Sequence, residues 1–112
     1  MINIVCPSRY HIARKKIKTD VDAFFISHGL TAEQNLNLVF VGRNKMKAIA
    51  SRYKKEPVAL PVLSFPYAKN DGLVGEILIC YPQAVLLAAE RNKKVDAMLK
   101  ELIEHGIKNL IQ

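Results

Sequence analysis

Apolar and polar positions repeat with two different periods along this chain, and each change of period marks an expected element. Short apolar runs with a period near two predict strands, which we place at residues 1–6, 36–42, 62–66 and 74–80. Apolar positions spaced by three and four predict helices, which we place at residues 15–28, 44–56, 82–92 and 95–110. This order predicts an α+β fold with a mixed sheet of about four strands and helices packed on it. The length of 112 residues suits one domain, so we expect a single domain over residues 1–112.

Glycine, proline and asparagine mark the expected boundaries of these elements. Gly29 suits the position just after the first helix, and Asn44 has a side chain that can cap the second. Pro57 prevents the second helix from continuing. The Asp71–Gly72 pair lies between two apolar runs and predicts two neighbouring strands joined by a loop. Pro82 suits the first turn of the third helix.

The final helix has the clearest pattern, an apolar stripe centred near Gly106. Its members repeat at three and four: Val95, Met98, Leu99, Leu102, Ile103, Gly106, Ile107 and Leu110. The stripe continues to Leu110 with no C-cap after it. We therefore expect either that residues are absent from this chain or that a protein partner covers the end of this helix.

One border of this stripe carries the residues with potential metal chemistry. Glu101, His105 and Asn109 step by four, so their side chains form a column along the helix. Two histidines at i and i+4 are a frequent zinc arrangement, but here the second position is Asn109, and a neutral amide is a weak zinc ligand. Three interpretations of His105 stay open: a border histidine without a ligand, the first ligand of a zinc site, or a partner of Glu101 in a different metal site.

The charge of the chain points to a polyanionic partner. Lysine and arginine number 17 against 10 acidic residues, which gives a net charge of +7. Residues 43–55 contain no carboxylate, and further cations lie within residues 9–18. Such clusters concentrate positive potential and favour nucleic acid, although a small basic domain need not bind any specific polyanion. The candidate RNA-binding residues of the first cluster are Arg43, Lys45, Lys47, Arg52, Lys54 and Lys55.

Cysteine usage and the absence of long apolar runs bear on the compartment. Cys6 and Cys80 have no cysteine or histidine at ligand spacing, so we expect two reduced thiols. The sequence shows no signal peptide, and no apolar run approaches the roughly 20 residues that span a bilayer. We expect a soluble cytoplasmic protein with no membrane partner.

Three short motifs, in this order and at this spacing, resemble one known family. They are LSFP at residues 63–66, GEILI at residues 75–79 and LIEHG at residues 102–106. Together they resemble the YbeY family of bacterial rRNA-maturation metallo-endoribonucleases, over the chain from Leu36 to its end. The resemblance implies a single YbeY-like domain, a single-stranded RNA substrate, and a role in 16S rRNA 3′-end processing and ribosome quality control.

The resemblance also implies zinc held by three histidines of the motif H-G-x-x-H-L-x-G-Y-D-H, with the zinc activating a water for attack on phosphate. His105 and Gly106 match the first two positions, and Leu110 matches the leucine. Asn109 stands in place of the second histidine, and the sequence ends before the third. With one of three ligands present, we do not expect this chain to hold zinc stably, and whether it is an enzyme stays open.

Other departures from the family pattern fall at polar positions. The Tyr-Arg pair of the family corresponds to Tyr53 and Lys54, and lysine lacks the planar, bidentate contact of arginine with phosphate. The family's Thr-Asp corresponds to Leu60 and Pro61, whereas the acid of the GEILI strand is kept as Glu76. The alternative to an endoribonuclease is therefore a non-catalytic RNA- or ribosome-binding domain. Its candidates for base stacking are Tyr53, Tyr67 and Phe65, although for Phe65 we favour core packing.

Overall fold

The computed structural model describes residues 2–30, 34–67 and 73–111. The order of its helices and strands is the predicted one, and most boundaries agree to within a few residues. The elements are β1 (Ile2–Val5), α1 (Arg14–Ser27), β2 (Asn35–Val41), α2 (Arg43–Tyr53), β3 (Val62–Pro66), β4 (Leu73–Cys80), α3 (Tyr81–Glu90) and α4 (Val95–Ile111).

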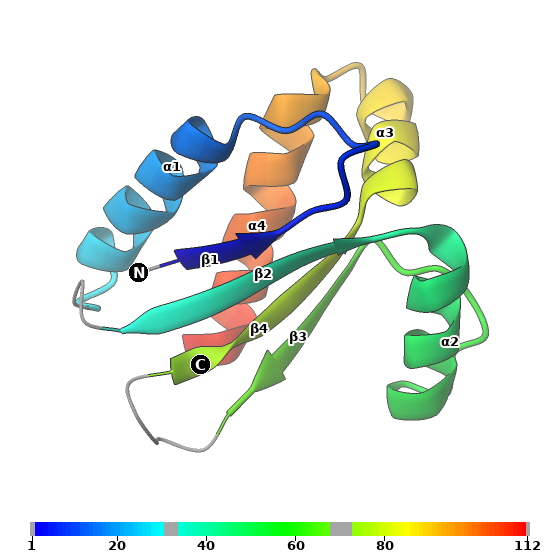
Figure 1. The fold of residues 1–112 in the computed structure, drawn as a ribbon, viewed down its shortest axis with the longest axis horizontal. Coiled ribbons are helices and arrows are strands. Elements are labelled where there is room, and N and C mark those ends of the chain that lie inside the picture. Colours follow the sequence, from blue (N-terminus) through cyan, green and yellow to red (C-terminus); the bar gives the residue numbers. More distant parts are fainter. Residues whose placement is uncertain (1, 31–33, 68–72, 112) are drawn as a thin grey trace.

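A single mixed sheet has the strand order β1-β2-β4-β3 (Figure 1). β1 pairs with β2, and β2 with β4, in parallel, whereas β3 pairs with β4 in antiparallel register. The predicted α+β fold and mixed four-stranded sheet are confirmed. The prediction that the last two strands are neighbours is also confirmed, while the Asp71–Gly72 pair that suggested it lies outside the described residues.

Helices cover both faces of the sheet, but unequally. The larger core joins one face to α1, α3 and α4, and its centre is formed by side chains with almost no exposure, among them Leu36, Leu38, Ile77 and Ile79. The smaller core joins the other face to α2 through Met46 and Ala50. In β2 the buried and half-buried positions alternate as predicted, because successive side chains point to opposite faces. No helix in the described part of the chain is long and apolar enough to cross a membrane.

Helix α4 approaches the sheet closely at Gly106, the centre of its predicted stripe. A Cβ atom at Gly106 would lie 3.0 Å from the Cδ1 atom of Ile77 and 3.2 Å from the Oγ atom of Ser64. The hydroxyl of Ser64 donates a hydrogen bond of 3.0 Å to the carbonyl oxygen of Gly106. The absence of a side chain thus allows the helix backbone to bond directly to strand β3.

The helix ends follow the predictions at α1 and α3 but not at α2. At the end of α1, Gly29 has φ +75°, and the N–H groups of Gly29 and Leu30 bond back to the carbonyls of Ile26 and Phe25 in a Schellman motif. Pro82 lies in the first turn of α3, as predicted.

The prediction that Asn44 caps α2 is wrong. The N-cap is Gly42, whose extended backbone continues directly from β2 and whose carbonyl accepts the N–H of Met46 at 3.1 Å. The N-cap of α2 therefore lies two residues before the expected one, because the N-terminus of the helix is set by the end of the strand and by burial of Met46.

We predict that Gly75→Ala lowers the free energy of unfolding by about 1–3 kcal/mol, a cost typical of overpacking. A Cβ atom at Gly75 would lie 2.6 Å from the carbonyl oxygen of Phe65 and 2.7 Å from the Cδ2 atom of Leu110. Urea unfolding measures the change. The matched control is the pair of variants Leu110→Ala and Gly75→Ala/Leu110→Ala. Because a backbone oxygen withdraws less easily than a side chain, the double variant should be less stable than Leu110→Ala alone, and equal stabilities would contradict the prediction.

Candidate nucleic-acid interface

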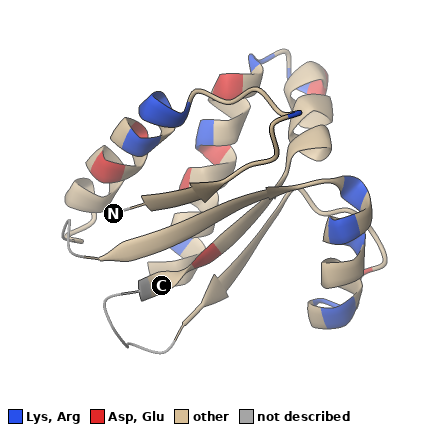
Figure 2. Ribbon diagram, viewed as in Figure 1, with Lys and Arg blue, Asp and Glu red and all other residues tan. Residues whose placement is uncertain are grey.

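The six predicted RNA-binding cations are all exposed, and they are spread along α2 and the residues after it. Figure 2 shows lysine and arginine on α2 from its first turn to its last, with no acidic residue on the helix. Arg43 and Lys45 lie at its start, Lys47 in its second turn and Arg52 in its last turn. Within the described part of the chain, none of the six forms a salt bridge. The cations of α2 are therefore available to an outside anion.

A groove beside the end of α2 brings the predicted stacking residues together. Its lining residues come from α2, from β3 and the residue after it, and from β4: Ile49, Arg52, Tyr53, Phe65, Tyr67, Glu76 and Leu78. The rings of Tyr53 and Phe65 meet edge to face, with centroids 5.2 Å apart. Tyr53 is 62% exposed and Tyr67 43% exposed, whereas Phe65 packs against the smaller core as predicted. Two tyrosines are thus placed where an unpaired base can stack on them.

The groove is not uniformly basic, because Glu76 lies in it with Arg52. Glu76 is half-buried in β4, between Asn37 of β2 and Phe65 of β3 in the sheet register. Its carboxylate opposes the approach of a phosphate to the floor of the groove. For a nucleic-acid ligand, this geometry favours bases in the groove and phosphates on the exposed side of α2.

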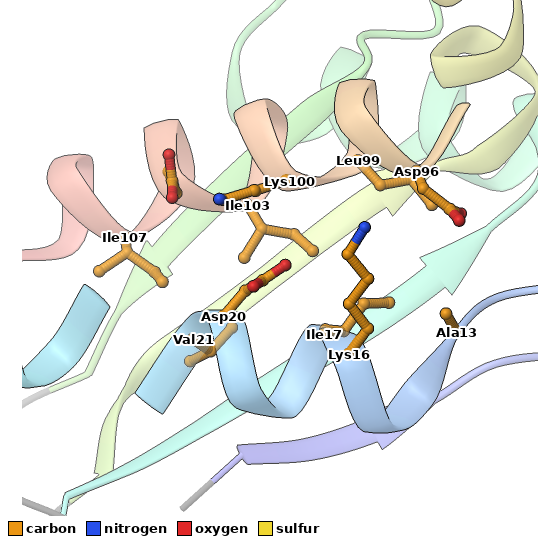
Figure 3. Close-up of a pocket in the computed structure, with 11 residues that line it drawn as sticks. Ala13, Lys16, Ile17, Asp20, Val21, Asp96, Leu99, Lys100, Ile103 and Ile107 are labelled. Atoms are coloured by element: carbon orange, nitrogen blue, oxygen red, sulfur yellow. The ribbon is translucent and has the colours of Figure 1, made fainter. Parts of the chain in front are cut away.

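A second groove, between α1 and α4, has a different character (Figure 3). Ile17 and Val21 of α1 point toward Ile103 and Ile107 of α4 and form an apolar floor. Side chains of both signs surround this floor: Lys16, Asp20, Asp96, Lys100 and Glu104. Because the carboxylates offset the lysines, this groove does not suit a polyanion.

The remnant of the metal motif lies on α4, which packs on the opposite face of the sheet from α2. His105 and Asn109 are exposed. Glu101, the proposed companion of His105, instead accepts a hydrogen bond and ion pair from Lys93, and this bond holds the pKa of its carboxyl below the usual value. Lys93 thus already engages the carboxylate that the third interpretation of His105 requires.

The donor set of the described residues does not fit a zinc ion. Among the residues that the structure describes, no three of the types His, Cys, Asp or Glu come close enough to hold a metal together. His28 stacks on Phe24 at the end of α1, with ring centroids 4.1 Å apart. Both cysteines are free, and burial raises the pKa of the Cys6 and Cys80 thiols, so they are protonated at neutral pH. The described residues therefore offer one imidazole where the family motif has three.

The comparison with protein families shows which family this chain belongs to. The family model described as Endoribonuclease YbeY matches residues 7–111. The chain belongs to the YbeY family. A YbeY endoribonuclease of Cupriavidus necator is 31% identical over 96 residues, which are 84% of this chain and 46% of that protein. One from Thermodesulfovibrio yellowstonii is 32% identical over 80 residues, 68% of this chain and 50% of that protein. The chain thus spans about half the length of these curated YbeY relatives.

A solved structure shows the same fold. The solution structure of TM1509 from Thermotoga maritima matches with a TM-score of 0.72 and 22% sequence identity, and covers 100% of this chain and 73% of that one. The predicted YbeY resemblance is confirmed by the family match, and the predicted fold is confirmed by this neighbour.

One basic residue near α2 was not among the predicted site residues. Arg9 lines a crevice together with Arg43 and Lys45, although it lies 34 positions before Arg43 in the sequence. A signal was available, because Arg9 follows the first strand and Arg43 the second. Residues that follow neighbouring parallel strands come to the same edge of a sheet.

We predict that the purified chain, after dialysis, contains well below one zinc per molecule by elemental analysis. A stable zinc site in a protein has three or four side-chain ligands, and the described donors include no such group. His105→Ala is the matched variant and should leave the zinc content unchanged. About one zinc per chain in the parent, lost in His105→Ala, would show that this histidine has found further ligands.

Proposed function

We propose that this YbeY-family chain acts in the maturation of ribosomal RNA, at the 3′ end of 16S rRNA and in ribosome quality control, by binding single-stranded RNA. The observation that carries the proposal is the charge of α2. This helix exposes several cations, contains no carboxylate, and lies on the less covered face of the sheet. Membership of a family named for an endoribonuclease supports RNA as the polyanion. With ribosomal RNA as its proposed ligand, we expect the chain to act in the cytoplasm.

In this proposal, phosphates contact the exposed side of α2 and the residues after it. Lys47 and Arg52 are one to two helical turns apart, so they can contact successive phosphates of one strand. Tyr53 and Tyr67 accept bases in the groove next to Arg52. Because most of the contacts are with phosphate, we expect binding that is strongly salt-dependent and weakly specific for sequence.

We further propose that this chain binds RNA without hydrolysing it. A zinc-activated water requires a firmly held ion, and the described residues that carry the family motif supply His105 alone. The second candidate is a metal-dependent endoribonuclease. It is favoured by the exposure of His105, because the imidazole could bind a metal ion together with ligands from another molecule. RNA cleavage with added zinc, abolished by His105→Ala, would support that candidate.

A protein partner at the end of α4 is also proposed. Leu110 and Ile111 are half-buried against the larger core, so part of each side chain stays exposed. A ribosomal protein next to the bound RNA would cover the remainder. Such a contact adds affinity without any change in the contacts of α2 with phosphate.

We predict that Lys47→Ala/Arg52→Ala weakens binding to single-stranded RNA and flattens its salt dependence. Each lost phosphate contact reduces the slope of log K against log salt concentration by about 0.7 for single strands, so two contacts should reduce it by about 1.4. Fluorescence anisotropy at several salt concentrations measures both quantities.

The matched control is Lys15→Ala/Lys18→Ala, which removes the same charge from exposed positions of α1 on the other face of the sheet. This control should leave the slope nearly unchanged. Equal effects of the two double variants would show that net charge, and not α2, determines binding. An unchanged slope in Lys47→Ala/Arg52→Ala would overturn the proposed interface.

A further inference from the structure

A crevice opens where the chain leaves β1 and β2. These parallel neighbours end at the same edge of the sheet, and from there α1 packs into the larger core and α2 into the smaller one (Figure 1). Adjacent parallel strands whose connections leave toward opposite faces form a cleft between them, the usual ligand site of open α/β sheets. This crevice has a volume of ≈ 850 Å³, within the range of about 300–1,000 Å³ typical of small-molecule sites.

The crevice combines an apolar floor with a strongly basic wall. Val5, which is 50% exposed, and Val39 belong to its lining and come from paired positions of β1 and β2. Three cations from two separate segments also line it, Arg9 before α1 and both Arg43 and Lys45 on α2. No aspartate or glutamate is among the described residues that line it. Three positive charges around one crevice favour a compact, multiply charged anion.

Aromatic contacts hold Arg9, one of the three cations, in position. The ring of Tyr10 stacks on Tyr81 at the start of α3, with centroids 4.6 Å apart and planes 18° apart. The guanidinium of Arg9 lies 4.8 Å from the centroid of the Tyr10 ring and donates a hydrogen bond of 3.4 Å to its hydroxyl. Groups held in this way lose less conformational entropy when a ligand binds.

Because Gly42 has no side chain, Tyr10 and Arg9 can lie close to the start of α2. A Cβ atom at Gly42 would lie 3.2 Å from the Tyr10 hydroxyl and 3.7 Å from the Nη2 atom of Arg9. The first turn of α2 has no acidic residue and no side-chain cap hydrogen bond. The Tyr10 hydroxyl and the Arg9 guanidinium therefore lie next to the N-cap of α2. Arg43 and Lys45, in the first turn of this helix, line the same crevice.

We propose that this crevice binds a phosphomonoester, the terminal phosphate of an RNA strand or the phosphate of a free nucleotide. Arg9, Arg43 and Lys45 donate to the phosphate oxygens. The attached sugar and base lie over the apolar floor formed by Val5 and Val39. Where the phosphate is the terminal phosphate of an RNA strand, this inference rests on the proposed function.

The charge of the crevice favours a phosphomonoester over a phosphate within a strand. A phosphomonoester carries about −1.5 to −2 charges at neutral pH because its second pKa is near 6, whereas a diester carries a single charge. Three cations gain more from the former, and a desolvated crevice strengthens the difference. Phosphates within a strand instead suit the extended row of cations along the outside of α2.

The test compares one single-stranded RNA sequence with a 5′-phosphate, a 3′-phosphate or only hydroxyl ends, and compares adenosine monophosphate with adenosine. At one fixed salt concentration, we expect at least fivefold tighter binding of a phosphate-ended ligand than of its hydroxyl counterpart. Arg9→Ala and Lys45→Ala should each remove this preference. Lys47→Ala/Arg52→Ala should weaken all RNAs but keep the preference.

The outcomes separate this inference from the proposed function. If hydroxyl-ended RNA binds but no terminal phosphate improves binding and adenosine monophosphate does not bind, the crevice proposal is overturned and RNA binding by α2 stands. If only adenosine monophosphate shows the preference, and Arg9→Ala removes it, the ligand is a free nucleotide and the crevice proposal stands without the RNA function. A preference that survives Arg9→Ala and Lys45→Ala also overturns the crevice proposal.

Discussion

The close contact of α4 with β3 and β4 is the constraint on which the other features of this fold depend. Six residues of α4 are buried, and the contact is closest at Gly106, where a hydrogen bond from Ser64 joins strand to helix. Helix α4 shares its face of the sheet with α1 and α3, so among the described helices the other face is covered by α2 only. This unequal covering leaves room beside α2 for the groove near Tyr53 and for the crevice near Arg9.

Two adjacent residues of the YbeY motif have different roles in this chain. Gly106 is buried and lets the helix approach Ile77, so packing alone explains why glycine stands there. His105 is exposed and has no second imidazole one turn away, because Asn109 occupies that position. In this chain the close packing of α4 on the sheet therefore uses Gly106 and not the exposed His105.

The cations at the two ends of α2 lie in different surroundings. At its start, Arg43 and Lys45 meet Arg9 in a crevice without a carboxylate among its described lining residues. At its end, Arg52 shares a groove with Glu76 and exposed tyrosines. A concentrated charge suits a compact anion, and a mixed, aromatic groove suits a base, so one helix can serve two parts of a nucleotide chain.

Local sequence signals predicted the helices and strands of this protein, whereas the packing of these elements sets which functional side chains meet. Periodicity, Gly29 and Pro82 predicted the helices and strands because these signals act over a few neighbouring residues. Asn44, the predicted cap of α2, is not the cap because the start of this helix depends on where β2 ends and on burial of Met46.

The cations were visible in the sequence, but their division between a crevice and a groove was not. The meeting of Arg9 with Arg43 depends on the parallel pairing of β1 with β2, and the separation of α2 from His105 depends on which face each helix covers. Such contacts join residues far apart in the chain. Local periodicity carries no information about them, because the order of strands and the faces of the sheet arise only when the whole core packs.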